Sequence, residues 1–391
     1  MLYHFNEIKT IHLEITDSCN AACPMCARNI NGGEDNPQLP NTELYLDDVK
    51  KIFTPEFIKQ LDRLYMCGNY GDPIAARDTL EVFDYFRQCN SRMNLSMHTN
   101  GSAKKPEWWS ELAKVLGKNS YVVFSLDGLE DTNHLYRQNT IWSKIMQNAQ
   151  AFIDAGGRAR WDYIVFEHNE HQVEEARQLS QKMGFEKFQF KKSARFFSNA
   201  SGMTKDAHQA ANRKGTTTLL KPPVDSKYRN LALEELSKID KKTDDTITFV
   251  PRKADEAFIV QGKQKFYLDP NKKKPMEKYW DEVSIKCKVA EEKSLYVSAE
   301  GIVQPCCWTA GQMYVWYWEP KGSQIWQAIN QIGKDNLNAK QHSLESIVNG
   351  LYFQDIVPNS WNKSSCAEGK LQVCAKTCGV KNDMFNNQFA G

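Results

Sequence analysis

Residues 19–26 read Cys19-Asn20-Ala21-Ala22-Cys23-Pro24-Met25-Cys26 and place three thiols in one short segment. The segment follows an apolar run, Thr10 to Ile15, that has the composition of a strand. Four thiolates normally complete a 4Fe–4S cluster, so three local cysteines predict a cluster with one iron left open for another ligand. The alternative is a zinc knuckle completed by a distant His or Cys, although such knuckles usually begin with a closer cysteine pair.

Outward from this segment, residues 1–191 alternate short apolar runs with helical patterns, which predicts strand–helix units and a parallel sheet. Strands are expected at Thr10 to Ile15, Leu64 to Met66, Leu95 to Met97, Tyr121 to Leu126, Trp161 to Phe166 and Phe188 to Phe190. Helices are expected at Thr79 to Gln88, Glu107 to Leu116, Ile141 to Ala155 and Gln172 to Met183. Six such units do not complete an eight-stranded barrel. The predicted fold class is therefore α/β, with an open, partial (β/α)6 TIM-like barrel.

Polar residues follow several of the expected strands. In parallel sheets of this kind, ligands bind at the carboxyl ends of the strands. Each of these residues also fits an ordinary turn, but together they are expected to line one rim. The candidate segments are Cys67-Gly68-Asn69-Tyr70-Gly71-Asp72-Pro73, His98-Thr99-Asn100-Gly101 and Ser125-Leu126-Asp127-Gly128, with Arg137 ten residues past Asp127.

Composition limits the class of protein. The chain has 391 residues, 41% of them hydrophobic, and a formal charge of +2, which is not the charge of a nucleic-acid or membrane binder. No apolar run approaches the roughly 18 residues of a membrane span. The first residues show no signal-peptide pattern, so the eleven cysteines are expected to be reduced thiols in a cytoplasmic protein.

The pattern changes at residues 192–286, which are rich in lysine and interrupted by prolines. Residues 191–286 contain 21 Lys and Arg against 13 Asp and Glu. We interpret 192–286 as a long, partly ordered crossover, either a solvated linker or a lid that recognises an anionic group. The run Lys272-Lys273-Lys274 is compatible with the second interpretation.

Six of the eleven cysteines lie between residues 287 and 378. Leu295 to Pro305 has the pattern of a hairpin with its turn at Glu300-Gly301, which can bring Cys287 and Cys306 together. Cys374 and Cys378 can then close a four-thiolate site for iron and sulfur or for structural zinc. Cys307 and Cys366 are left as buried thiols or as substitutes. Residues 287–391 are expected to form a small cysteine-rich α+β domain.

The three-thiol segment and the residues around it resemble the radical S-adenosylmethionine (radical SAM) superfamily, whose cluster loop is C-x3-C-x2-C. The resemblance covers about residues 8–191 and implies that Cys19, Cys23 and Cys26 hold three irons of a 4Fe–4S cluster. Gly71-Asp72-Pro73 resembles the G-E-P element of the family for the methionyl amino group, with Asp in place of Glu. Thr99, Asn100, Ser125 and Arg137 match positions that commonly hold the ribose and carboxylate. Met25 stands where the family usually has an aromatic residue.

The last quarter resembles the twitch and SPASM extensions of radical enzymes. This resemblance implies an auxiliary 4Fe–4S cluster, for which we favour Cys287, Cys306, Cys374 and Cys378 as ligands. A full SPASM domain has more cysteines in its second half than this chain supplies, so one auxiliary cluster, not two, is expected.

The reaction implied by the resemblance is reductive cleavage of S-adenosylmethionine (SAM) to a 5′-deoxyadenosyl radical that abstracts hydrogen from a substrate. The leading hypothesis is a peptide or protein substrate, with flavodoxin or ferredoxin as external electron donor. The alternatives are a radical dehydrogenase of a small sugar or nucleoside-like molecule and a non-catalytic iron–sulfur or zinc protein that binds a partner. No residue is predicted to be catalytic, and no membrane or clear nucleic-acid partner is expected.

Overall fold

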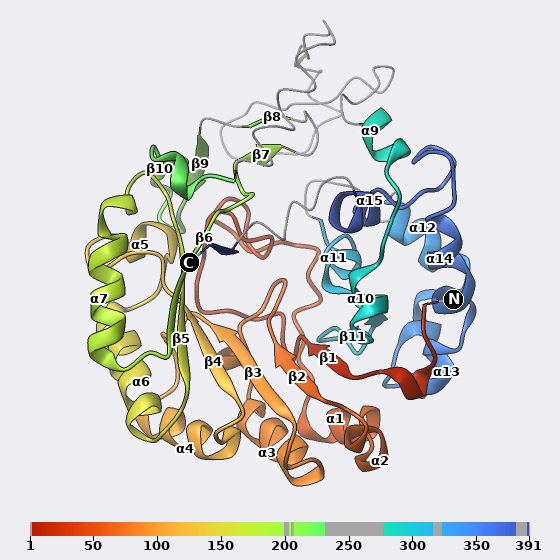
Figure 1. Cartoon of the computed structure of the whole chain (residues 1–391), viewed down its shortest axis with the longest axis horizontal. Helices are drawn as coiled ribbons and strands as arrows, with labels where there is room; N and C mark the ends of the chain where they lie inside the picture. The colour runs from red at the N-terminus through yellow and green to blue at the C-terminus, as the bar shows by residue number, and fades with distance from the viewer. Residues whose placement is uncertain are drawn as a thin grey trace, which may run out of the picture.

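The computed structural model (Figure 1) describes residues 2–198, 203–204, 207–230, 277–315, 323–380 and 389–390. Its centre is a parallel sheet whose first six strands follow the order of the chain. They are β1 (Thr10–Leu13), β2 (Arg63–Met66), β3 (Asn94–Thr99), β4 (Tyr121–Ser125), β5 (Ala159–Ile164) and β6 (Lys187–Lys191). The predicted partial barrel is confirmed. The largest difference is at β5, which begins and ends two residues before the predicted strand.

Helices connect these strands and cover the outside of the sheet (Figure 1). The last long one ends at Gly184, which has the left-handed conformation (φ 89°) that favours glycine after a helix. The helices are α1 (Leu46–Ile52), α2 (Pro55–Lys59), α3 (Thr79–Cys89), α4 (Pro106–Leu116), α5 (Asn133–Tyr136), α6 (Trp142–Asp154) and α7 (Val173–Met183). Short 3-10 turns are η1 (Phe5–Glu7), η2 (Pro73–Ala75) and η3 (Glu170–Gln172).

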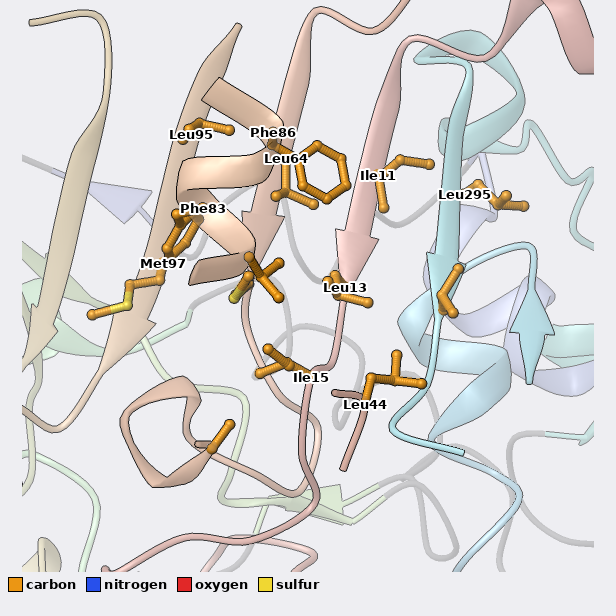
Figure 2. Close-up of a cluster of buried hydrophobic side chains, with 14 of the residues drawn as sticks. Ile11, Leu13, Ile15, Leu44, Leu64, Phe83, Phe86, Leu95, Met97 and Leu295 are labelled. Carbon is orange, nitrogen blue, oxygen red and sulfur yellow. The ribbon is translucent and has the colours of Figure 1, made fainter. Parts of the chain in front are cut away.

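Alternate residues of the strands face opposite sides of the sheet. Figure 2 shows apolar side chains of β1, β2 and β3 gathered with Phe83 and Phe86 of α3. The residues between them include His12 and Tyr65, whose rings stack at 4.3 Å, and the half-buried His98. The outer face of the sheet therefore holds the apolar core, and polar side chains occupy the inner face. Labelled residues of this core include Ile11, Leu13, Leu64, Leu95 and Met97.

The predicted C-terminal hairpin forms, but it joins the barrel sheet. β11 (Ser294–Val297) pairs in parallel with β1, and β12 (Val303–Gln304) pairs antiparallel with β11. Its turn contains Gly301 at φ 88°, as the sequence predicted. With β13 (Phe389–Ala390) antiparallel to β6, the described residues form a nine-stranded sheet. The elements on either side of the predicted 286/287 boundary thus share one sheet.

The remaining C-terminal elements are short and lie beside β1 and β11 (Figure 1). They are α9 (Glu277–Glu282), α10 (Lys288–Glu291), α11 (Cys307–Ala310), α12 (Gln324–Asn330), η8 (Lys334–Leu337), α13 (Leu344–Val348), the π-helix η9 (Tyr352–Ile356), α14 (Val357–Ser360) and α15 (Gln372–Cys378).

The described part of the crossover contains two small antiparallel pairs. They are β7 (Phe197–Ser198) with β8 (Met203–Thr204), and β9 (His208–Ala211) with β10 (Thr217–Leu220), followed by η4 (Ser226–Tyr228). The run Lys272-Lys273-Lys274 lies outside the described residues. Where the structure describes the chain, no helix combines the length and apolar character that crossing a membrane requires.

Candidate active site

The three-thiol segment forms the loop after β1. Its backbone is held by bonds from the Cys26 amide to the Cys23 carbonyl at 3.0 Å and from the Ala22 amide to the Gln138 carbonyl at 3.0 Å. Cys23 is buried, whereas Cys19 and Cys26 are half-buried. The loop therefore presents three neighbouring thiols from one rigid turn.

Hydrogen-bond donors surround these thiols. The Ala21 amide lies 3.4 Å from the sulfur of Cys19, and a guanidinium nitrogen of Arg137 lies 3.8 Å from that of Cys23. Burial raises the pKa of Cys23 to about 11, while the nearby Arg137 acts to lower it. Iron bound by these sulfurs would favour the thiolate form, and the donors around them would stabilise its charge.

A cavity of about 570 Å³ opens beside the thiols. All nine residues predicted for the first cluster and for SAM line it, although they come from five different loops and strand ends. They are Cys19, Cys23, Cys26, Gly71, Asp72, Thr99, Asn100, Ser125 and Arg137. Met25 also lines it. Three thiols beside a cavity of this size fit a 4Fe–4S cluster with one open iron and a cofactor bound next to it.

Asp72 joins two of these loops. One of its oxygens accepts bonds from the amide and the side chain of Asn100, both at 2.7 Å, and the other accepts the Ile74 amide at 3.2 Å. The Asn100 side chain also donates to the Asn20 side chain at 2.9 Å, within the cluster loop. Asp72 thus orients the loops that follow β2 and β3 relative to the cysteines.

Arg137 forms an ion pair with Asp127, which was not among the predicted SAM-binding residues. Its Nε lies 2.6 Å from the carboxylate of Asp127, whose side chain is fully buried. The other oxygen of Asp127 accepts the Ile164 amide at 2.5 Å. Asp127 therefore orients Arg137 toward the cavity. The signal in the sequence was a carboxylate just after an apolar strand, in Ser125-Leu126-Asp127-Gly128.

The cavity is also lined by two charged residues that the sequence analysis did not predict. Asp162 of β5 and Lys191 of β6 form an ion pair at 2.6 Å, and both line the cavity with His98 and Cys67. Burial, followed by the charge of Lys191, lowers the pKa of His98 to about 3, so its ring is neutral at neutral pH. The signal was a charged residue inside an otherwise apolar strand, Trp161-Asp162-Tyr163.

Part of the crossover covers the cluster loop. Leu220 and Ala210 of the β9–β10 hairpin and Phe196 pack in one apolar cluster with Ala21 and Cys23. The Ala211 amide also donates to the Asn31 carbonyl at 2.7 Å. The described hairpin therefore packs in the same apolar cluster as the thiol of Cys23 and covers part of the cluster loop.

A second thiol site lies in the C-terminal part. Cys287 and Cys306 immediately precede α10 and α11, and Cys374 and Cys378 lie on α15. All four line one narrow cavity with apolar walls that include Trp361. They are the four ligands that the sequence analysis favoured, whereas Cys307 and Cys366 do not line the cavity. Four thiols around one cavity are a candidate ligand set for an iron–sulfur cluster or for zinc, although no three of them lie close enough together here for a single zinc ion.

All eleven cysteines fall within described residues, and none of them forms a disulfide. Among the described side chains, no three or more His, Cys, Asp or Glu converge closely enough to hold a single metal ion.

Comparison with known families and structures agrees with this geometry. The family model of the Radical SAM superfamily matches residues 13–179, which run from the end of β1 into α7. The matched segment contains the three-thiol loop and every predicted SAM-binding residue.

Solved structures share the fold at low identity. The structure of anSMEcpe with bound AdoMet and the Kp18Cys peptide is 13% identical, with a TM-score of 0.50; the match covers 95% of this chain and 89% of that chain. Streptococcus suis SuiB bound to the precursor peptide SuiA is 16% identical, with a TM-score of 0.46. This match covers 94% of this chain and 77% of that chain. At such identities the likeness concerns the fold alone.

Proposed function

Because residues 13–179 match the family model of the Radical SAM superfamily, we propose that the chain cleaves SAM reductively and modifies a peptide or protein substrate. The observation that carries this proposal is the single cavity shared by the three thiols and the six predicted SAM-binding residues. The family uses a 4Fe–4S cluster and SAM, which together supply the radical that removes hydrogen from the substrate.

Each group of residues has a separate task. Cys19, Cys23 and Cys26 would hold three irons, and the donors around them would stabilise the cluster charge. Arg137, oriented by Asp127, would bind the SAM carboxylate. The loop containing Asp72 would receive its amino group. The β9–β10 hairpin would exclude water from this side of the site.

Two observations bear on the substrate. The anSMEcpe structure holds a peptide in a protein of this fold, which supports the peptide proposal. The Asp162–Lys191 ion pair favours a polar group at the cavity floor, which suits a peptide amide and also suits the second candidate, a small polar molecule such as a sugar. The four C-terminal thiols would hold an auxiliary cluster that exchanges an electron with the substrate. An external flavodoxin or ferredoxin would supply electrons to the first cluster.

The test is SAM cleavage by anaerobically reconstituted protein with dithionite. The unaltered chain should release 5′-deoxyadenosine and methionine, and Cys23→Ala should release neither. Arg137→Lys keeps a charge near Asp127 but loses the planar fork, so SAM affinity should fall about tenfold while the iron content is retained. No cleavage by a fully iron-loaded chain would overturn the proposal.

The substrate class is tested by isotope tracking. Because the radical takes hydrogen from the substrate, 5′-deoxyadenosine gains deuterium from a deuterated substrate. With extract fractions from cells grown in deuterated medium, singly deuterated 5′-deoxyadenosine should form with the peptide fraction. Deuterated 5′-deoxyadenosine that forms only with the small-metabolite fraction would favour the sugar or nucleoside alternative.

A further inference from the structure

The loop Gly68–Asp72, which carries two of the predicted SAM-binding residues, is held from the barrel side by Glu14. One oxygen of this buried carboxylate accepts the amide of Tyr70 at 2.7 Å and that of Gly71 at 3.1 Å. Its other oxygen accepts the hydroxyl of Tyr296, which belongs to β11 of the C-terminal part. Glu14 therefore ties the loop to both halves of the chain.

The same loop is held from the other side by α11. The side chain of Asn69 donates to the Cys307 carbonyl at 2.7 Å, and the Tyr70 hydroxyl donates to the Gly311 carbonyl at 3.1 Å. The Tyr70 ring is buried, and its centre lies 5.9 Å from that of Tyr314 in an edge-to-face arrangement. Since Cys307 directly follows Cys306, these bonds join the loop to the backbone next to the second thiol site.

The loop also lies very close to the segment that follows β1. A Cβ at Gly71 would come within 1.8 Å of the Thr16 carbonyl oxygen, so the backbone here has no room to shift toward that segment. The Asp72 amide donates to the Ser18 carbonyl at 2.9 Å, directly before the cluster loop. The position of Asp72 relative to Cys19 thus depends on how well the preceding residues are held.

We propose that Glu14 and α11 form a clamp that positions the Gly68–Asp72 loop for SAM, and that the C-terminal part thereby sets the affinity of the chain for SAM. The identity of the ligand rests on the proposed function. Asn69 and Tyr70 also line the cavity, but their side-chain polar atoms donate to the carbonyls of Cys307 and Gly311. We therefore treat them, with Glu14, as positioning residues that act on SAM through the loop.

The physical basis is pre-organisation. The loop has no secondary structure of its own, so its bonds to Glu14 and α11 add to those of Asp72 with Asn100 and Ser18 and raise the fraction of molecules in which Asp72 is correctly placed. Apparent affinity falls in proportion to that fraction. The cysteines lie on a different loop, so iron binding should not change.

The test uses anaerobically reconstituted full-length protein, with SAM as the probe in equilibrium dialysis. Asn69→Ala and Tyr70→Phe should each raise the Kd for SAM about five- to tenfold, as expected for the loss of one hydrogen bond. Iron content should stay equal to that of the unaltered chain, and KM for SAM should rise more than kcat falls.

Two further variants separate positioning from general destabilisation. Asn90→Ala also removes side-chain bonds to two carbonyls, those of Ile58 and Leu61, but it lies just before β3, at the opposite end of the strand from the cavity. It should leave the Kd for SAM unchanged. Glu14→Gln keeps an acceptor for the loop amides and should bind SAM within about twofold of the unaltered chain, unlike Glu14→Ala.

The outcomes are distinguishable. Unchanged affinity in both Asn69→Ala and Tyr70→Phe, with tight binding by the unaltered chain, would overturn the clamp and leave the proposed function intact. An iron-loaded, unaltered chain that binds no SAM would overturn the proposed function and the clamp with it.

Discussion

At the scale of single residues, Glu14 is a carboxylate that the fold keeps almost wholly out of water. Burial raises its pKa to about 7 from an ordinary value of 4.5, despite the hydrogen bonds it accepts from Tyr296, Tyr70 and Gly71. At intermediate pH the folded chain therefore keeps a proton that the unfolded chain releases. This difference makes stability depend on pH.

We expect Glu14→Gln to become more stable relative to the unaltered chain as pH rises. Between pH about 4.5 and about 7, the unfolded state loses the Glu14 proton first, so the Glu14 contribution to stability falls by about 3 kcal/mol and then levels off. The difference in Tm between the two proteins should widen from pH 5 to pH 7.5 in favour of the variant. A difference in Tm that stays constant with pH would show that the pKa of Glu14 is the same in the folded and the unfolded chain.

Asp127 and Arg137 show a second consequence of burial. Removing one partner of a buried ion pair leaves the other charge unpaired, which typically costs about 3 to 5 kcal/mol. Truncating Arg137 therefore changes stability as well as any contact with SAM. For this reason Arg137→Lys is the more informative variant at this position.

At the scale of elements, the β9–β10 hairpin places Leu220, 2% exposed, in the apolar cluster that includes Ala21 and Cys23 of the cluster loop, and its neighbour Leu219, 59% exposed, toward solvent. Adjacent residues of one strand thus differ in burial because they point to opposite faces.

Leu220→Ala should therefore weaken the cover over the first cluster, while Leu219→Ala serves as its matched control. The loss of buried apolar contact is expected to cost about 2 to 5 kcal/mol. Water and oxygen should then reach the cluster, so its visible absorbance should decay several-fold faster in air. Equal decay in both variants would show that the hairpin does not protect the cluster.

The position of β11, beside β1 in the barrel sheet, was also not predicted. Its register with β1 pairs Tyr296 with His12 and puts the Tyr296 hydroxyl on Glu14. The hairpin therefore supports both the second thiol site and the inner face of the barrel.

At the scale of the whole molecule, the two thiol sites should bind iron separately. Reconstituted protein should hold about eight irons per chain, because each set suits a four-iron cluster. Cys19→Ala and the double variant Cys374→Ala with Cys378→Ala should each lose about half. About four irons and one zinc in the unaltered chain would instead assign zinc to the second site.

The double variant also separates the role of the first thiol site in SAM cleavage from the role of the second site in the substrate reaction. With dithionite it should still release deoxyadenosine, since the first site is intact, but it should form no modified substrate. Its Tm must be measured on the same sample. A folded double variant that makes the full amount of product would contradict an electron-transfer role for the second site.

The sequence by itself determined the barrel strands and the candidate ligands of the first cluster. The C-x3-C-x2-C spacing predicts Cys19, Cys23 and Cys26 as these ligands, and the apolar periodicity predicted all six barrel strands, because both signals are local. The polar residues at strand ends could be grouped in advance, since parallel strands end at one edge of the sheet. The four favoured C-terminal cysteines also line one cavity.

Only the tertiary structure decided how distant segments meet. The pairing of β11 with β1, the Asp162–Lys191 pair and the bonds from Asn69 and Tyr70 to α11 each join residues that no local pattern connects. Likewise, Asp127 meets Arg137 only because the chain turns back through α5, which lies between the two residues. Such contacts depend on how the elements pack, and packing is determined by the whole set of buried surfaces and satisfied hydrogen bonds at once.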